Sequence, residues 1–408
     1  MKLRNFPTFT MIVLAASLFM AIGIVALNHQ GTNHLDTNPS STNPLMDREG
    51  EGSDSGSVIE QQLSPELYYD KVRAAWQTIL IANYTGLEHE GLYLDEPSEE
   101  TSIELVLLEQ WPTDDDTSVE WVDLHILETY GLHPTYEQIR DEWVDHLNHD
   151  IWVSTRQARD LMDIGVVPPQ TGEARLNPEG VWTIDAQLQT ELFGLIAPGL
   201  PDVAMNQARY FARVTNSGFA VEASQFYASA YADAFFVFHV PTLIERAQSR
   251  FPKDSDIAQI VTFVQTCHTN HPDNWRTCRQ MIRDRYDTDP VWWGARVNFA
   301  SAIMALLYGE GDLMETMTIG SLAGWDADNN VTTGAGLLAL IVGYDGLPEA
   351  FRSASDTYFN EDVTGDLPKT QTVAEIAERT QRLAEQTIIE AGGQVLSDRY
   401  VVVSHSVE

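Results

Sequence analysis

The chain has 408 residues, 43% of them hydrophobic, which is long enough for one large core or two ordinary domains. It has 24 Lys and Arg against 60 Asp and Glu, so its net charge is −36. A surface of that charge repels phosphate backbones, and we therefore expect no nucleic-acid partner. The charge favours cations, although acidity alone is also typical of proteins adapted for solubility or for salt.

The first 27 residues have the pattern of an export segment. Lys2 and Arg4 precede the uncharged apolar run MIVLAASLFMAIGIVAL at residues 11–27. Since this run is at the short limit for a membrane span, it predicts either a cleaved signal peptide or a retained anchor, and we prefer the anchor. In both cases we expect an exported protein, periplasmic or extracellular, with possible membrane anchoring through residues 11–27.

Beyond this segment, composition divides the chain into a linker, a domain and a tail. Residues 28–63 are polar and acidic and predict a disordered linker. Residues 64–395 are expected to fold, and residues 396–408 to form a C-terminal tail that includes the clearest strand pattern, RYVVVSHSV. Apolar spacing in the domain is mostly helical, so we expect an all-α fold in one large bundle. The expected helices cover residues 68–84, 118–131, 136–147, 203–214, 223–238, 257–267, 295–309, 332–344 and 372–393.

The two cysteines, Cys267 and Cys278, lie ten residues apart on either side of a predicted loop. In an oxidising compartment they could form a disulfide, and otherwise they are two separate thiols. The sequence leaves both possibilities open.

The stretch WPTDDDTSVEW places Asp114, Asp115 and Asp116 side by side before a predicted helix. Thr117 and Glu120 resemble a capping box at the start of that helix. The helix dipole contributes about 0.3–1 kcal/mol per exposed charge, which is a weak explanation for three carboxylates between two tryptophans. A divalent cation such as Mg²⁺, Mn²⁺ or Ca²⁺ is the alternative, because hard oxygen ligands suit these ions. On this stretch alone, both interpretations stay open.

A second acidic turn, GSLAGWDADNNVTTGAG at residues 320–336, contains Asp326, Asp328 and Asn329 in a loop before a helix of small residues. A calcium-binding helix-loop-helix would need a Glu about nine residues further on, where Leu337 stands. Two acidic turns, each before a buried helix, suggest one site for one or two metal ions.

A third stretch, residues 85–91, contains Glu88 and Glu90 and ends in a glycine turn after a predicted helix. By itself it is typical of a helix C-terminus with solvated acids.

Taken in order, Gly86 to Glu90, Asp114 to Thr117 and Gly324 to Asn329 resemble the motifs of the ADP-ribosylglycohydrolases, which include the dinitrogenase-reductase-activating glycohydrolase. The resemblance covers about residues 66–395 and implies a single large orthogonal helical bundle with two Mg²⁺ ions, or Mn²⁺, at the base of a cleft. By position it implies the ligands Asp114, Asp115, Asp116, Asp326, Asp328 and Asn329. The sequence departs from the family at Asp114 and Asn329, where the family has Thr, unless the register shifts by one residue and Thr113 takes the first of these places.

The resemblance also implies a metal-dependent hydrolase that cleaves an N- or O-glycosidic bond to ADP-ribose or a related riboside. The substrate would be a small molecule or an ADP-ribosylated protein. A family glutamate at the end of the first helix orients the substrate, and Glu90 is our choice for it, with Glu88 next. Asp115 or Asp328 would be the second catalytic carboxylate. The alternative is a catalytically inactive riboside- or metal-binding protein of the same fold, since Asn216 stands where family members acting on ADP-ribose have His.

Other residues are given ordinary roles. We interpret Trp292 and Trp293 as core residues, with lining of the cleft as the alternative. We interpret His125 as a core histidine. The arginines that could contact a diphosphate, Arg209, Arg213 and Arg296, are interpreted as surface residues.

Overall fold

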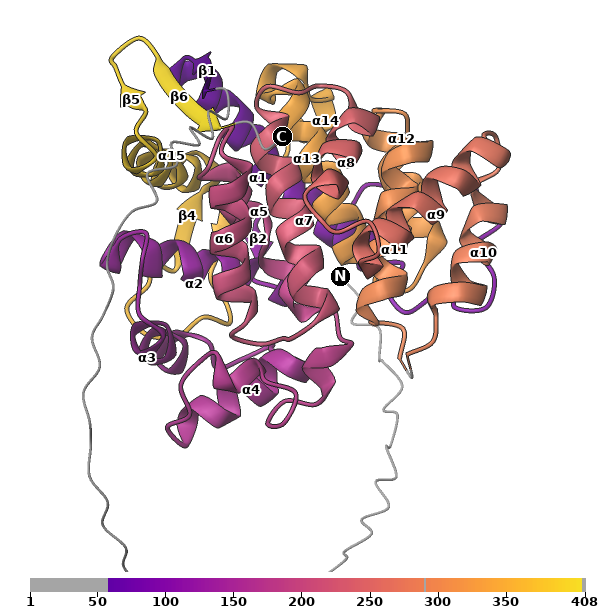
Figure 1. Cartoon of the computed structure of the whole chain (residues 1–408), viewed down its shortest axis with the longest axis horizontal. Coiled ribbons are helices and arrows are strands. Elements are labelled where there is room, and N and C mark those ends of the chain that lie inside the picture. The colour runs from indigo at the N-terminus through magenta and orange to yellow at the C-terminus, as the bar shows by residue number, and fades with distance from the viewer. Residues whose placement is uncertain (1–57, 290, 406–408) are drawn as a thin grey trace, which may run out of the picture. The chain divides into compact units, whose positions relative to one another are not determined.

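The computed structural model describes residues 58–289 and 291–405, which are mostly helical (Figure 1). The predicted export segment and most of the predicted linker lie outside the described residues. In the part that is described, no helix is both long and apolar enough to span a membrane. The α-helices are α1 (Pro65–Gly86), α2 (Asp115–Tyr130), α3 (Tyr136–His146), α4 (Val153–Asp163), α5 (Glu191–Leu195), α6 (Pro201–Ala212), α7 (Phe219–Ala234), α8 (Val240–Ser249), α9 (Asp256–Asn270), α10 (Trp275–Tyr286), α11 (Ala295–Tyr308), α12 (Leu313–Ala323), α13 (Ala327–Val342), α14 (Glu349–Arg352) and α15 (Val373–Glu390).

All nine predicted helices are present, but the fold is not purely α. Two small three-stranded sheets accompany the helices, with strand orders β1-β6-β5 and β2-β3-β4. The strands are β1 (Val58–Leu63), β2 (Trp111–Pro112), β3 (Thr357–Phe359), β4 (Thr370–Thr372), β5 (Gln394–Val395) and β6 (Tyr400–His405).

The first sheet corrects the predicted domain limits. β1 pairs antiparallel with β6, with Leu63 opposite Tyr400. The prediction of a disordered linker up to residue 63 is therefore wrong for residues 58–63. The segment VIEQQL is too polar to be recognised as a strand, and it is ordered by hydrogen bonds to the apolar strand predicted near the C-terminus.

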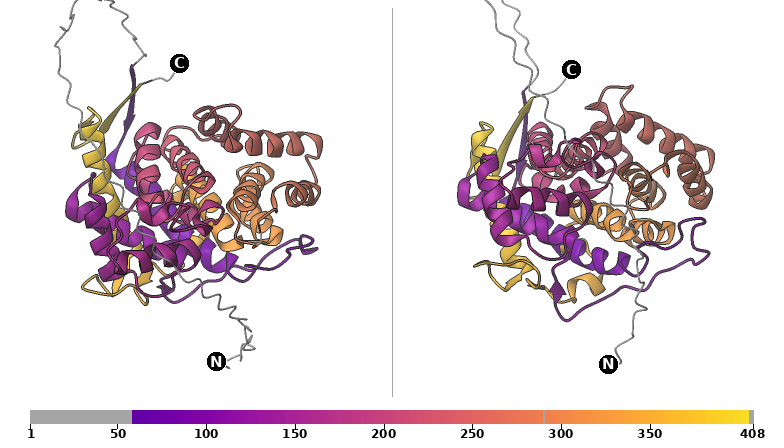
Figure 2. Two further views of the ribbon diagram at one scale, coloured as in Figure 1. Left: turned by 60° about the horizontal axis from the view of Figure 1, so that its bottom comes forward. Right: turned by 90° about the horizontal axis from the view of Figure 1, so that it is seen from below.

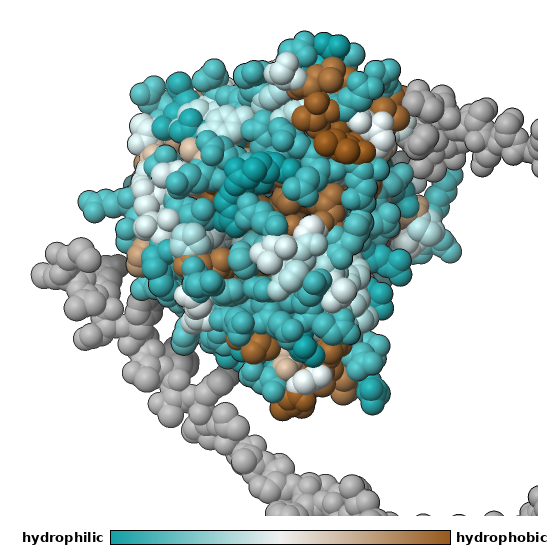
Figure 3. All heavy atoms as spheres, turned by 90° about the vertical axis from the view of Figure 1, so that its left-hand side faces the viewer, coloured by the Kyte–Doolittle hydropathy of each residue, from teal (hydrophilic) through white to brown (hydrophobic). Residues whose placement is uncertain are grey.

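The middle of the described domain contains α1, α5, α7 and α13 (Figure 1), with α9–α12 on one side and α2–α4 on the other. Periodic apolar residues bury these central helices almost completely. The side of the domain shown in Figure 3 is mostly hydrophilic, and its hydrophobic residues form separate small patches. This distribution agrees with the excess of acidic residues in the sequence.

The antiparallel pair α1 and α13 determines where the acidic turns meet. Gly86, the last residue of α1, lies so close to α13 that a Cβ there would be 2.4 Å from the Cα of Asp328. No larger residue fits this contact without movement of the helices. The absence of a side chain at residue 86 therefore brings the end of α1 against the first turn of α13.

We predict that Gly86→Ala lowers the free energy of unfolding by about 1–3 kcal/mol, because it overpacks this contact. Gly334→Ala is the matched control on α13, since its Cβ would meet only ordinary contacts, the nearest at 3.6 Å. The control should leave stability unchanged or raise it by up to about 1 kcal/mol. Urea unfolding of both variants checks this, and equal effects of the two would contradict the close contact.

Below the first acidic turn, α2 and α5 bury two further carboxyl groups, Glu120 and Glu191. The backbone N–H of Leu192 donates to Oε1 of Glu120 at 2.8 Å. The predicted capping role of Glu120 is therefore wrong, because its side chain points into the core rather than toward Thr117. Burial raises the pKa of Glu120 well above its usual value, and the charge of Glu191 raises it further.

A carboxyl group whose pKa is higher in the folded than in the unfolded protein stabilises the fold at low pH. This contribution is lost as the pH rises through the pKa of the folded state. We therefore predict that Glu120→Gln raises the free energy of unfolding of the metal-free protein at pH 8. The gain over wild type should be on the order of 1–2 kcal/mol larger at pH 8 than at pH 5. Glu378→Gln, at an exposed position of α15, should show no such pH-dependent gain. Denaturant unfolding at the two pH values provides the comparison.

Candidate metal centre

The three adjacent aspartates lie at the N-terminus of α2, which begins three residues earlier than predicted. Asp114 is the N-cap residue: its Oδ1 accepts from the backbone N–H of Asp116 at 3.3 Å, and its own N–H donates to Thr117 Oγ1. The capping box thus joins Asp114 and Thr117. Just upstream, β2 pairs with β3, and the N–H of Thr113 donates to Phe359 O at 3.1 Å. This pairing fixes the turn from its N-terminal side.

Two amide side chains from neighbouring helices hold the aspartates in place. Nδ2 of Asn83, on α1, donates to Asp114 Oδ1 and Asp116 Oδ2, both at 3.1 Å. Nδ2 of Asn329, on α13, donates to the other oxygen of Asp116 at 3.2 Å. Asp116 is therefore oriented from both sides, and α1 and α13 meet at the start of α2.

The second acidic turn is also the start of a helix rather than a loop. Asp326 is the N-cap residue of α13, and Asp328 and Asn329 lie in its first turn. Oδ1 of Asn298, on α11, accepts from the Asp326 backbone N–H at 3.1 Å and from Asn330 Nδ2 at 2.9 Å. Both acidic motifs therefore place carboxylates at a helix N-terminus, where the helix dipole favours negative charge.

A buried arginine on α10 connects this turn to the segment that carries Glu90. Arg279 Nε donates to Ala323 O at 3.0 Å, and its guanidinium lies 3.8 Å from the ring centroid of Trp325. The same guanidinium donates to the carbonyls of Tyr93 and Leu94. In Figure 2 this segment runs from the end of α1 past α10 and α12. Arg279 thereby fixes the Glu90 turn relative to the second aspartate turn.

Five of the predicted site residues form two overlapping groups of carboxylates. Asp114, Asp116 and Asp328 form one, and Glu90, Asp326 and Asp328 form the other; within each group the closest oxygens lie within 4.8 Å of one another. Asp328 belongs to both. Its Oδ1 is buried and has no hydrogen-bond partner among the described residues. An unpartnered buried carboxylate oxygen facing other carboxylates is the arrangement that a divalent cation satisfies.

The carboxyl groups raise one another's pKa values. Burial raises the pKa of Asp116 well above its usual range, and the charge of Asp328 raises it further. For Asp328, burial is again the largest cause, followed by Asp326 and Glu90. Capping and amide hydrogen bonds therefore leave the ionised cluster under-compensated, and the donor set, which is all hard oxygen, fits Mg²⁺ or Mn²⁺.

The structure separates the other predicted residues from these groups. Asp115 belongs to neither group, although its side chain lines the adjacent pocket. Asn329 contacts the centre through its amide nitrogen. Glu88 is exposed. Asn216 is buried, and its Nδ2 donates to Gly180 O and Thr183 O, so it does not line the pocket.

The carboxylates form the floor of a pocket of about 350 Å³. Its remaining walls contain residues that the sequence did not single out, notably Trp152 and Asp185. Trp292 and Trp293 are partly buried and also line the pocket, so the alternative holds for both, and Trp292 packs against the core as well. None of the described residues that line it is Lys, Arg or His. The lining residues are Leu87, Glu90, Asp114, Asp115, Asp116, Trp152, Val153, Ile184, Asp185, Leu188, Trp292, Trp293, Asp326 and Asp328.

A larger pocket, of about 680 Å³, lies between α3, α6 and α15 and is lined in part by Tyr136 and Tyr210. The two carboxylate groups lie at the smaller pocket instead, so we assign the functional site by its chemistry rather than by size. Elsewhere, Cys267 and Cys278 are both buried as free thiols. Arg296 pairs with Asp256 at 2.7 Å and does not line the acidic pocket.

The helical fold and the acidic pocket together define a protein with a candidate divalent-cation centre. The chain belongs to the ADP-ribosylglycohydrolase family, whose model matches residues 64–388. This confirms the resemblance drawn from the motifs, and the family indicates a glycohydrolase. Among solved structures, 43 chains match. One, an "ADP-ribosylglycohydrolase-related protein complex", has a TM-score of 0.53 at 17% identity, over 79% of this chain and 99% of that chain, which shows the fold alone. No curated protein matches.

We predict that Asp328→Asn separates stability from cation binding. In chelator, the variant should be at least as stable as wild type, because one repelling carboxylate is gone. Mg²⁺ should stabilise wild type, by about 2.7 kcal/mol at a concentration 100 times its Kd, and should have little effect on the variant. Thermal unfolding with and without Mg²⁺ measures both effects.

The control for this prediction is Asp160→Asn, an exposed change of equal charge on α4. It should respond to Mg²⁺ as wild type does. An Asp328→Asn variant that is stabilised by Mg²⁺ to the wild-type extent would exclude Asp328 as a ligand.

Proposed function

We propose that this protein is a metal-dependent hydrolase that cleaves an N- or O-glycosidic bond to ADP-ribose or a related riboside. The observation that carries the proposal is the pair of carboxylate groups sharing Asp328 at the floor of a pocket. Family membership supports the reaction class. The acidic donor set supports a hard divalent cation, and we propose Mg²⁺, with Mn²⁺ as a possible substitute.

The two overlapping groups of carboxylates could hold two cations, and Asp328 would be available to either group. Asp114 and Asp116 would complete one ligand set, and Glu90 and Asp326 the other. Ions bound there supply Lewis-acid stabilisation of sugar hydroxyls and lower the pKa of a water molecule. The side chains of Asn83 and Asn329 hold Asp114 and Asp116 in position, so little rearrangement of these two carboxylates is needed when they bind a cation.

The carboxylates can then be given separate tasks. Asp328 belongs to both groups and is best used as a ligand. The carboxylate of Asp115 is outside both groups and faces the pocket, so an oxygen of this side chain can accept a proton from an attacking water molecule. Glu90 is more exposed than the aspartates of the two groups and can accept a hydrogen bond from a substrate hydroxyl.

The walls of the pocket favour a sugar over a free diphosphate. Trp152, 57% exposed, stands at the pocket together with Trp292. Flat aromatic faces stack on the apolar side of a sugar ring or on a base and exclude water. Because the described lining residues are acidic, aromatic or apolar, a diphosphate attached to the ribose would have to lie outside the carboxylate floor or contact the bound cations.

The test is release of ADP-ribose from ADP-ribosylated arginine and serine peptides by the metal-loaded protein. We predict release that requires Mg²⁺ or Mn²⁺. Asp115→Asn should lower kcat by about 10²–10⁴-fold, as expected for the loss of a general base, while metal-dependent stabilisation is retained. Asp328→Asn should lose both release and stabilisation. Asp160→Asn serves as the control and should release ADP-ribose at the wild-type rate.

The possible outcomes distinguish the two candidate functions. Metal-dependent stabilisation without release from these peptides or from simpler ribosides would favour the inactive binding protein of the same fold. Release that is insensitive to chelator and to Asp328→Asn would contradict the metal-dependent mechanism.

A further inference from the structure

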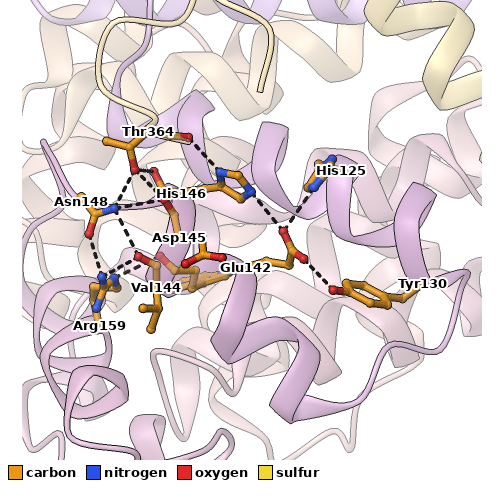
Figure 4. Close-up of polar contacts among 10 residues, drawn as sticks. His125, Tyr130, Glu142, Val144, Asp145, His146, Asn148, Arg159 and Thr364 are labelled. Carbon is orange, nitrogen blue, oxygen red and sulfur yellow. Dashed lines mark hydrogen bonds and ion pairs between the residues drawn. The ribbon is translucent and has the colours of Figure 1, made fainter. Parts of the chain in front are cut away.

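A second cluster of potential metal ligands lies between α2 and α3, away from the acidic pocket. His125 on α2 and Glu142 and His146 on α3 each direct one ligand atom to a common point, all within 4.8 Å of one another (Figure 4). Nε2 of His125 and Nε2 of His146 lie 3.2 Å and 3.1 Å from the same oxygen, Oε2 of Glu142. His125 is therefore not a core histidine, and its side chain is 25% exposed.

The ring of His146 is held with Nε2 directed at this point. Its Nδ1 lies 2.8 Å from the backbone oxygen of Thr364. Because a carbonyl can only accept, Nδ1 carries the proton and Nε2 of the neutral ring presents its lone pair. Gly365, with φ of +83°, allows the backbone to pack directly against this ring, since a Cβ there would be 2.6 Å from Nδ1. A histidine that donates its other N–H to a carbonyl is the usual second-shell arrangement of a metal ligand.

Glu142 and the end of α3 are fixed in a similar way. The hydroxyl of Tyr130 donates to Oε1 of Glu142 at 2.6 Å, which leaves Oε2 for the two histidines. Arg159, buried on α4, donates to the carbonyls of Val144 and Leu147 at 2.9 Å each. Figure 4 shows these hydrogen bonds around His146 and Glu142, whereas among the residues drawn His125 contacts Glu142 alone.

The contact between His146 and Glu142 needs a positive charge. With Nδ1 protonated, a neutral His146 places the Nε2 lone pair 3.1 Å from a carboxylate oxygen, which is repulsive. A proton between these two atoms or a metal ion relieves this repulsion. Ligands bound at about 2.0–2.2 Å around a tetrahedral zinc ion lie about 3.3–3.6 Å apart, so both observed distances would need to lengthen by only a few tenths of an ångström. Two imidazoles and one carboxylate are a common zinc donor set.

We propose that His125, Glu142 and His146 bind a Zn²⁺ ion that joins α2 to α3, with water in the fourth position. The site differs from the acidic centre in its donors, since imidazole nitrogen prefers zinc whereas clustered carboxylates prefer magnesium. It is also distant from that centre, because His125 lies nine positions after Asp116 on α2, which corresponds to about 13 Å along the helix axis. The proposal does not depend on the glycohydrolase reaction.

The test uses the full chain, stripped with a chelator and then kept in excess Mg²⁺ to fill the carboxylate centre. Zn²⁺ is titrated by calorimetry, and bound zinc is counted by elemental mass spectrometry. We expect one Zn²⁺ per chain with micromolar or tighter affinity, retained in Asp328→Asn. His125→Ala and His146→Ala should each weaken binding at least tenfold, by analogy with the loss of a ligand contact. Co²⁺ in place of Zn²⁺ should give the visible absorption of a low-coordinate site.

The matched control is His133→Ala, which removes a histidine that pairs with Glu390 alone. It should leave zinc affinity unchanged. His146 is buried and its variant could unfold, but the His125 side chain is 25% exposed, so His125→Ala keeps the test decisive once circular dichroism shows a folded protein. The proposal would be overturned if wild type failed to bind Zn²⁺ in excess Mg²⁺, or if folded His125→Ala bound zinc as tightly as wild type. The three side chains would then be held together by shared protons rather than by a metal ion.

Discussion

The repulsion among carboxylates in one small volume is the constraint on which the rest of the site depends. Two helix N-termini and the amides of Asn83 and Asn329 stabilise part of this charge. The raised pKa values of Asp116 and Asp328 indicate that these groups do not balance it. The fold keeps the carboxylates together because the close packing of α1 against α13 fixes the backbone of Asp328 at the end of α1. A site that is costly without a cation is, by the same geometry, preorganised to bind one.

This packing brings carboxylates from three distant parts of the chain to one pocket. Gly86 at the end of α1 allows the first turn of α13 to pack closely against it. The short β2–β3 pairing fixes the start of α2 next to this contact. Arg279 adds a fixed positive charge over the ring of Trp325 and is not among the residues that line the pocket. It supports the second turn and the Glu90 segment together, so the two carboxylate groups are positioned by one scaffold.

The sequence predicted nine of the α-helices because their apolar periodicity is a local property, and it missed helices of similar length such as α10 and α12. It placed the starts of α2 and α13 three and five residues too late, since Asp and Asn are weak helix formers in the interior and resemble loop residues. This matters for function, because Asp328 acts from a helix turn. Trp152 and Asp185 could not be found, as isolated residues carry no pattern and only tertiary folding brings them to the pocket. β1 was missed because its partner lies at the other end of the chain.

Helix α2 connects the two candidate metal sites and shows why they need not compete. Its first turn carries Asp114 to Asp116 with oxygen donors only, and its middle carries His125 with a nitrogen donor. Mg²⁺ binds imidazole poorly, and a zinc ion prefers His and carboxylate together to carboxylates alone. Because α2 is rigid between these points, an ion that fixes His125 against α3 would also limit movement of the aspartates. The separation of donor types along one helix thus allows one ion to serve structure while another serves the acidic pocket.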